Sequence, residues 1–294
     1  MPSLNDFAVP AADHVLSFMA ALEHTRAATP HDEWRTMVRT SPVIRSWRFF
    51  LSMDPYTRWG LVKPRGYAGD ATLMDFAYGH KSIQAHIAAS GPIATSIYAA
   101  TSGAKQSKSA RDRIELLRDE ITFMAASRPI SAISVASGHA RELEALPDST
   151  REHILSFTAI DLDIASLHEA KESAGSIDFK PIRRNVIKDE LSAQPGDLVY
   201  SLGLFDYLAD EHAYVVLNKM LALTASGGKC IVANLAPDAA NLGYCEAIMD
   251  WWMVTRSRND MLALGNSCGA VQDGSFSLEV RRMGCFHYLQ LIAA

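Results

Sequence analysis

The chain contains 294 residues, of which 48% are hydrophobic and 21% are charged. This composition is typical of a soluble globular protein and excludes a disordered or repetitive chain. The formal net charge of −5 provides no broad positive field, so neither nucleic acid nor an anionic membrane is expected as a partner.

Four cysteines, at positions 230, 245, 268 and 285, are widely spaced and include no CxxC pair. This spacing predicts neither a zinc site nor a disulfide framework, and no metal is expected. The opening residues MPSLNDFAVPAADHV lack a basic region followed by an apolar core, and no apolar run reaches about 18 residues. We therefore expect a cytoplasmic location.

The first 128 residues are predicted to form helices, over about residues 13–27, 32–38 and 109–127. Among them lies a compact polar loop, KPRGYAGD, at residues 63–70. Its Arg65 offers a planar fork for a carboxylate, and its Tyr67 adds an amphipathic ring. From composition alone, a solvated surface turn and a ligand-facing loop are equally good interpretations.

From residue 130 onward, apolar runs of strand length alternate with helical segments. The predicted strands cover residues 132–136, 157–160, 178–182, 198–202 and 229–234, and the predicted helices cover residues 141–146, 164–173, 212–224 and 242–264. This alternation predicts a parallel sheet covered by helices on both faces. Two final strands at 276–282 and 285–292, joined by Met283 and Gly284, predict an antiparallel hairpin.

The first strand–turn–helix–strand unit carries the features of a nucleoside site. Gly138 lies in the turn after the first strand, and the second strand ends on Asp161 and Asp163. A glycine lets the backbone approach a ligand, a helix N-terminus offers amide groups, and a carboxylate beyond the second strand accepts ribose hydroxyls. Asp161 follows Gly138 by 161 − 138 = 23 positions, close to the roughly 20 expected.

These features together resemble the class I S-adenosylmethionine-dependent methyltransferases. The first turn in that family usually reads DxGxGxG, whereas the matching stretch here is SVASGHARE, with Ser134 in place of the usual acid. The resemblance implies an α/β, Rossmann-like fold: a parallel sheet with a C-terminal antiparallel hairpin, and an N-terminal helical lid. It also implies S-adenosyl-L-methionine as cofactor, held at the strand ends by Ala136, Ser137, Gly138, Asp161, Leu162, Asn185, Val186, Ser201, Leu202 and Gly203.

Four segments resemble a narrower bacterial subfamily, which includes the synthase of a 3-hydroxy fatty acid methyl ester signal (extracellular factor). They are KPRGYAGD, ASGHARE, YSLGLFDYL and EAIMDWWMVTRS, in that order along the chain. The resemblance implies two domains, a helical lid or substrate region at residues 1–128 and a cofactor domain at residues 129–294. It also implies that the lid brings Arg65 and Tyr67 to the catalytic site.

Methyl transfer needs little covalent machinery, because the cofactor's methyl group is already activated. Aromatic faces accommodate a sulfonium, which makes Tyr207 and Tyr67 catalytic candidates, while Phe205 fits a core position better. Arg65 is the third catalytic candidate, as a partner for a carboxylate. Asp206 fits either a substrate amine or a helix cap, and capping is the commoner role. His139 and His287 are candidate bases, but no His–Asp pair is evident.

Lys63, Arg65 and Arg256 are candidate partners for a carboxylate, which favours an acid as the acceptor. The leading hypothesis is O-methylation of a small-molecule carboxylate or hydroxyl in secondary metabolism or signalling. One alternative is a non-methylating enzyme that cyclises the aminobutyryl chain of the cofactor and releases methylthioadenosine. A non-catalytic binding module is a third hypothesis, and the sequence leaves the oligomeric state open, a homodimer included.

Overall fold

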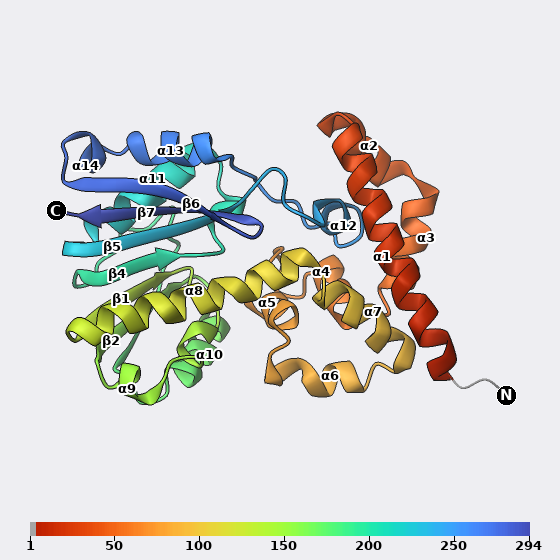
Figure 1. Ribbon diagram of the computed structural model, residues 1–294, viewed down its shortest axis with the longest axis horizontal. Helices are drawn as coiled ribbons and strands as arrows, with labels where there is room; N and C mark the ends of the chain where they lie inside the picture. Colours follow the sequence, from red (N-terminus) through yellow and green to blue (C-terminus); the bar gives the residue numbers. More distant parts are fainter. Residues whose placement is uncertain (1–3) are drawn as a thin grey trace. The chain divides into compact units, whose positions relative to one another are not determined.

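The computed structural model describes residues 4–294, with side chains from residue 12 onward. Its described part contains a seven-stranded sheet in the order β3-β2-β1-β4-β5-β7-β6 (Figure 1). Strands β1 to β5 are parallel, and β7 pairs antiparallel with both β5 and β6. The strands are β1 (Ile130–Val135), β2 (Ile154–Asp161), β3 (Phe179–Arg183), β4 (Gly196–Ser201), β5 (Thr224–Leu235), β6 (Phe276–Met283) and β7 (Phe286–Ala293).

The central strands are buried because apolar residues occupy both of their faces. Five of the six residues of β1 and of β4 are buried, as expected for parallel strands between two helical layers. On one face, Ile133, Val199 and Val232 pack with Leu217 and Met261 in a continuous core. The predicted α/β, Rossmann-like fold with a C-terminal antiparallel hairpin and an N-terminal helical region is confirmed.

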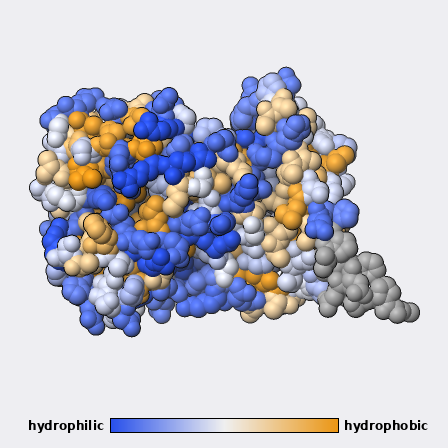
Figure 2. Space-filling model, viewed as in Figure 1, coloured by the Kyte–Doolittle hydropathy of each residue, from blue (hydrophilic) through white to orange (hydrophobic). Residues whose placement is uncertain are grey.

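Helices cover the sheet on both faces. Helix α10 packs on β2 and β3, α11 on β4 and β5, and α13 on β6 and β7 (Figure 1). The helical elements of this part are the end of α8 (Lys105–Ser127), η2 (Arg141–Leu143), α9 (Asp148–Arg151), α10 (Ile164–Ala174), η3 (Phe205–Tyr207), α11 (Asp210–Ala222), α13 (Arg258–Asn266) and α14 (Gly269–Gln272). On the face shown in Figure 2, apolar surface gathers over β6 and β7, and hydrophilic side chains surround it.

Two predicted helices differ from the structure. Residues 141–146 form only the three-residue 3-10 turn η2, because Ala140 takes a left-handed conformation (φ 48°) and Pro147 follows within one turn. The segment 242–264 is interrupted, since Asp250 has φ 50° and residues 250–257 are irregular between α12 and α13. The helix N-terminus expected beside the first turn is therefore absent from the described residues.

The chain divides into two compact units. The helical unit comprises the chain up to Arg111 together with Ala239–Trp252, and the sheet unit comprises Asp112–Asp238 and Met253–Ala294. The domain boundary expected at residue 128 thus falls inside the sheet unit, at the end of α8. Within the described residues, no helix is both long enough and apolar enough to cross a membrane.

The helical unit is held together by buried polar contacts. Glu246, only 2% exposed, accepts hydrogen bonds from Arg26 Nε at 2.7 Å and from Trp34 Nε1 at 2.7 Å. Its elements are α1 (Leu4–Ala28), α2 (His31–Thr40), α3 (Pro42–Leu51), α4 (Pro55–Val62), α5 (Ala71–Tyr78), η1 (Lys81–Ile83), α6 (Gln84–Ala88), α7 (Pro92–Ser102) and α12 (Leu242–Ala247).

Candidate functional site

The turn after β1 is tightly wound. Ala136, Gly138 and Ala140 all have positive φ, at 54°, 53° and 48°. For the two alanines this left-handed conformation is strained by about 1–2 kcal/mol each. Strained residues persist only where the surrounding structure holds them, and they cluster at functional sites. The turn is therefore the first candidate for a ligand-binding element.

Asp161 ties this turn to the end of β2. Its Oδ2 accepts the backbone amide of Gly138 at 2.9 Å, and its Oδ1 accepts the backbone amide of Asp163 at 2.9 Å. Burial raises the pKa of the Asp161 carboxyl, and hydrogen bonds from the amides of Asp163, Gly138 and Leu162 oppose that shift. A carboxylate has about four acceptor positions, so acceptor capacity remains for a ligand hydroxyl. The structure thus brings the turn glycine and the strand-end acid, both singled out in the sequence, into direct contact.

Unsatisfied hydroxyls mark the same edge of the sheet. The Oγ atoms of Ser137 and Ser201 are buried and have no hydrogen-bond partner among the described residues. Such groups in a folded protein point to strain or to a function. Gly203 follows β4 and Leu202, and a Cβ built on it would meet nothing within 4 Å. Space and polar atoms therefore occur together beyond β1 and β4.

The other predicted cofactor residues have diverse surroundings. Leu162 is 57% exposed beside Asp161, so an apolar surface is available to a flat ring. Val186 is 7% exposed and packs in the core. Asn185 uses its Oδ1 to accept the amides of Ile187 and Lys188, so it caps a turn. The structure therefore gives Asn185 and Val186 structural roles, while their predicted cofactor contacts stay predictions.

Tyr207 lies in η3, directly after β4, and is 37% exposed. Phe205 of the same turn is fully buried, which agrees with its expected core position. Asp206 does not cap the following helix: its Oδ1 accepts the Leu235 amide at 2.7 Å and Asn234 Nδ2 at 3.1 Å. Burial raises the pKa of Asp206 to about 7.

Arg256 is a structural residue. Its guanidinium is 2% exposed and donates to the carbonyl oxygens of Phe205 and Leu208 and to Asp210 Oδ1 at 2.6 Å. Arg256 is therefore not available to a substrate carboxylate, which corrects the sequence interpretation. Its role could not be seen in the sequence, because most of its partners lie 46–51 positions away.

The two candidate bases are buried. His139 is 5% exposed, and its Nδ1 lies 3.3 Å from Arg141 Nη2. His287 lies on β7 and is 8% exposed. Its pKa is lowered, mainly by burial and to a smaller extent by the charge of Arg282. His139 contacts the Arg141 guanidinium, His287 lies near the charges of Arg282 and Asp238, and both histidines are integrated into the packing.

The KPRGYAGD loop belongs to the helical unit, between α4 and α5. Asp70, 2% exposed, caps α5 through the Leu73 amide at 2.9 Å and accepts Trp59 Nε1 at 2.9 Å. Lys63 pairs with Asp250 at 2.8 Å. Between these anchors, Arg65 is partly buried and Tyr67 is 45% exposed. The catalytic roles predicted for Arg65 and Tyr67 remain predictions.

A cluster that the sequence interpretation missed lies behind the first turn. The Tyr200 hydroxyl donates to Glu142 Oε1 at 2.5 Å, and Tyr200 is 2% exposed. Arg113, 4% exposed, donates to the Leu202 carbonyl and lies over the Phe286 ring at 4.5 Å. The available signal was a glutamate directly after a glycine-containing turn. Only the sheet register, which pairs β1 with β4, brings Tyr200 to it.

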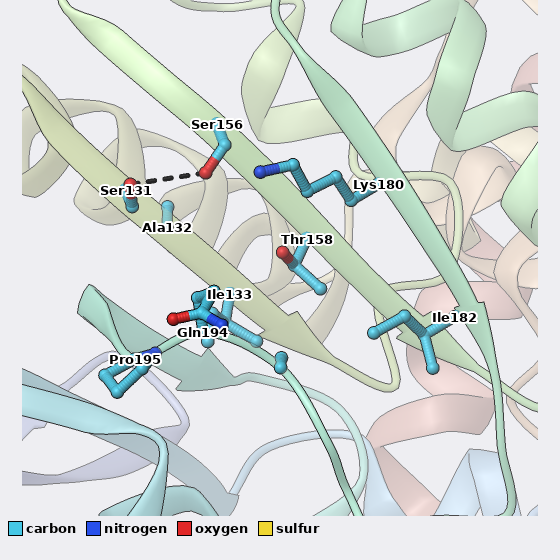
Figure 3. A pocket seen from close by; sticks show the side chains of 10 residues that line it. Ser131, Ala132, Ile133, Ser156, Thr158, Lys180, Ile182, Gln194 and Pro195 are labelled. Atoms are coloured by element: carbon cyan, nitrogen blue, oxygen red, sulfur yellow. Dashed lines mark hydrogen bonds between the residues drawn. The ribbon is translucent and has the colours of Figure 1, made fainter.

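A separate cavity of about 90 Å³ is lined by residues along β1, β2 and β3 and by residues 193–195 before β4 (Figure 3). Its polar lining includes Ser131, Ser156, Thr158 and Lys180. Ser156 donates to Ser131 across 3.2 Å, and Lys180 pairs with Asp178 at 3.4 Å. No three His, Cys, Asp or Glu side chains gather as a metal site within the described residues.

Comparison with known proteins adds a fold relationship. No family model matches the chain, and no curated protein matches it. A Bordetella parapertussis structure, described as a possible exported protein, is similar with a TM-score of 0.59 and 17% identity over 96% of both chains. At this identity the similarity shows a shared fold across nearly the whole chain.

Two methyltransferase structures show weaker likeness. Magnesium protoporphyrin IX methyltransferase of Synechocystis PCC 6803, with bound S-adenosylhomocysteine, has a TM-score of 0.47 and 11% identity, covering 63% of this chain and 84% of that one. The N-methyltransferase NodS of Bradyrhizobium japonicum WM9 has a TM-score of 0.46 and 12% identity, covering 63% and 87%. These scores are too low to support an inference about ligand or reaction.

Proposed function

We propose that this chain binds S-adenosyl-L-methionine at the carboxyl ends of β1, β2 and β4 and transfers its methyl group to a small molecule. The observation that carries the proposal is the bond from the Gly138 amide to Asp161, which joins the strained turn to the strand-end carboxylate. In open α/β sheets, ligands bind where the strand order reverses. Here that point lies between β1 and β4.

The residues at this edge fit the parts of the cofactor. Asp161 accepts the ribose hydroxyls, and the exposed Leu162 provides an apolar contact for the adenine ring. The half-buried Ala136, Ser137 and Gly138 offer a backbone lining close to the ligand. When bound, the cofactor supplies an activated methyl group on a sulfonium. The chain's own task is then to orient the acceptor and to exclude water.

We further propose an oxygen acceptor, either a carboxylate or a hydroxyl. A carboxylate is ionised at neutral pH and needs no general base, and the two candidate histidines are buried in packing roles. Tyr207, exposed just beyond β4, is the proposed neighbour of the methyl group, and Arg65 and Tyr67 are the proposed contributors from the helical unit. A long-chain 3-hydroxy acid is the first acceptor to test. The proposed location of the protein is the cytoplasm.

Calorimetry and product analysis test the proposal. The purified chain should bind both S-adenosylmethionine and S-adenosylhomocysteine. With a panel of 3-hydroxy acids it should release S-adenosylhomocysteine and a methyl ester or ether of the acid. Absence of measurable affinity for either nucleoside would overturn the proposal. Release of methylthioadenosine from S-adenosylmethionine alone would replace methyl transfer with cyclisation of the aminobutyryl chain.

A further inference from the structure

Glu142 is a carboxylate in an unusual position, directly behind the strained first turn. Glu142 lies in η2, two residues after Ala140. Its Oε1 accepts a hydrogen bond from the Tyr200 hydroxyl at 2.5 Å. Tyr200 is almost fully buried on β4, opposite Ser134 of β1, and the Ser134 hydroxyl hydrogen-bonds to Tyr200. Two neighbouring strands therefore cooperate to hold one carboxylate at their carboxyl ends.

The charge of Glu142 is not neutralised by an ion pair within the described part of the chain. Arg141, its neighbour, instead pairs with Glu144 at 2.8 Å and Glu169 at 3.1 Å. Arg113 and Arg141 both act on Glu142 through their charges, while the Arg113 guanidinium contacts the Leu202 carbonyl and the Phe286 ring. Burial has the largest effect on the Glu142 carboxyl and raises its pKa, and these two charges oppose that shift.

A carboxylate held in this way is stabilised by a cationic ligand group. Leaving a desolvated carboxylate without a cation is unfavourable, whereas an ammonium that donates to it removes the penalty. The donors on the described chain are the Tyr200 hydroxyl and the amide of Glu142 itself, so acceptor positions remain. An amino-acid group carries an ammonium of the required charge and size.

We propose that Glu142 binds the α-ammonium of the amino-acid end of S-adenosylmethionine and that Tyr200 is the residue that orients it. This inference rests on the proposed function, because it needs the cofactor at the ends of β1 and β4. Ser134 has a matching role: it hydrogen-bonds to Tyr200 and adds no charge beside it. A carboxylate at position 134 would instead place a second negative charge beside Tyr200.

The test compares two ligands that differ only in the ammonium group. S-adenosylhomocysteine and its deamino analogue are titrated into the full chain by calorimetry. The wild-type chain should prefer S-adenosylhomocysteine about tenfold to a hundredfold, the range for a hydrogen bond between charged groups. Glu142→Gln should abolish this preference without weakening the deamino analogue. Tyr200→Phe should reduce it, since the carboxylate remains but is no longer oriented.

Glu152→Gln is the matched control. It removes the same charge at an exposed position of the same connection, between β1 and β2. It should keep the wild-type preference. Equal affinity of the wild-type chain for the two ligands, or a preference that survives Glu142→Gln, would overturn the role of Glu142 and leave the proposed function standing. Failure of the wild-type chain to bind either ligand would overturn both. If Glu142→Gln does not fold, as judged by circular dichroism, the wild-type ligand pair and Tyr200→Phe decide the question.

Discussion

The backbone amide of Gly138 donates to Asp161 Oδ2 across 2.9 Å, so one carboxylate fixes both the turn after β1 and the end of β2. Asp161→Ala removes this bond, the bond to the Asp163 amide and the proposed acceptor of the ribose hydroxyls. We expect the affinity for adenosine and S-adenosylhomocysteine to fall by at least tenfold, because hydrogen bonds to charged groups contribute about 1.5–3 kcal/mol each. Calorimetry measures the change.

Asp148→Asn provides the control for that experiment. Asp148 lies at an exposed position in the first turn of α9, and its replacement removes the same charge from the same crossover. Its affinity for both nucleosides should match the wild type. Unaltered nucleoside binding by a folded Asp161→Ala chain would show that the strand-end carboxylate is only a structural tie.

Ala136→Gly should raise the free energy of unfolding, because glycine adopts φ 54° without the penalty that alanine carries. The expected gain is below about 1 kcal/mol, since glycine also gives the unfolded chain more freedom. Urea denaturation measures it. Ala132→Gly, at a position of β1 that is 1% exposed, should lower the free energy of unfolding instead. A loss of stability in Ala136→Gly as large as in Ala132→Gly would contradict the strained turn.

Asp206 should make the stability of the chain depend on pH. Burial raises the pKa of its carboxyl from 3.8 to about 7, so the folded chain binds this proton more tightly than the unfolded chain does. The stabilising contribution is therefore complete below pH 3.8 and is lost as the pH rises through 7. It amounts to roughly 4 kcal/mol, at about 1.4 kcal/mol for each pKa unit.

Asp206→Asn should remove this part of the pH dependence and preserve the fold. The two donors that reach Asp206 both bind Oδ1, which the asparagine retains.

Asp54 provides a contrast, because both of its carboxylate oxygens accept hydrogen bonds. Its Oδ1 accepts the amide of Tyr56, and its Oδ2 accepts the hydroxyls of Thr57 and Thr101. Asp54→Asn should therefore destabilise the chain at every pH. Unfolding free energies between pH 4 and 8 check both statements, and an unchanged slope in Asp206→Asn would refute the first.

Glu246 should be among the most sensitive positions of the helical unit. Glu246→Ala leaves the buried Trp34 indole and the Arg26 guanidinium without their acceptor. Removing one partner of a buried ion pair destabilises a protein by about 3–5 kcal/mol. The exposed Glu33→Ala on α2 is the control and should change the free energy of unfolding by less than about 0.5 kcal/mol. A Glu246→Ala chain with wild-type stability would show that the bonds from Arg26 and Trp34 to Glu246 do not stabilise the fold.

The sequence predicts the buried central strands well, because each of them contains a short apolar run. Residues such as Ile133 and Val199 are buried for reasons that a short window reveals, and the strand-end position of Asp161 follows from the length of one run. The glycine at 138 is informative for the same reason: its positive φ is a local requirement. The features from which we predict a nucleoside site are all of this local kind.

The helical segments and several polar residues could not be predicted in this way, since their partners are distant. Residues 141–146 have a helical pattern, yet the Arg141 side chain donates hydrogen bonds to Ser173 and Glu169 of α10. Arg256 has the charge of a substrate-binding residue but is surrounded by carbonyl oxygens of the turn after β4. The pairing of Glu142 with Tyr200 spans 58 positions, and only the strand order brings the two together.

The helical unit is assembled from two pieces of sequence, and this has a consequence for protein synthesis. Its core includes Leu242 and Tyr244 from Ala239–Trp252, a segment that follows five strands of the sheet in the chain. A nascent chain therefore lacks the part of this core that Leu242 and Tyr244 supply until residue 252 has left the ribosome. Neither unit can be obtained by a single cut, because residues 1–111 alone lack Glu246 and residues 112–294 alone carry a buried segment without its partners.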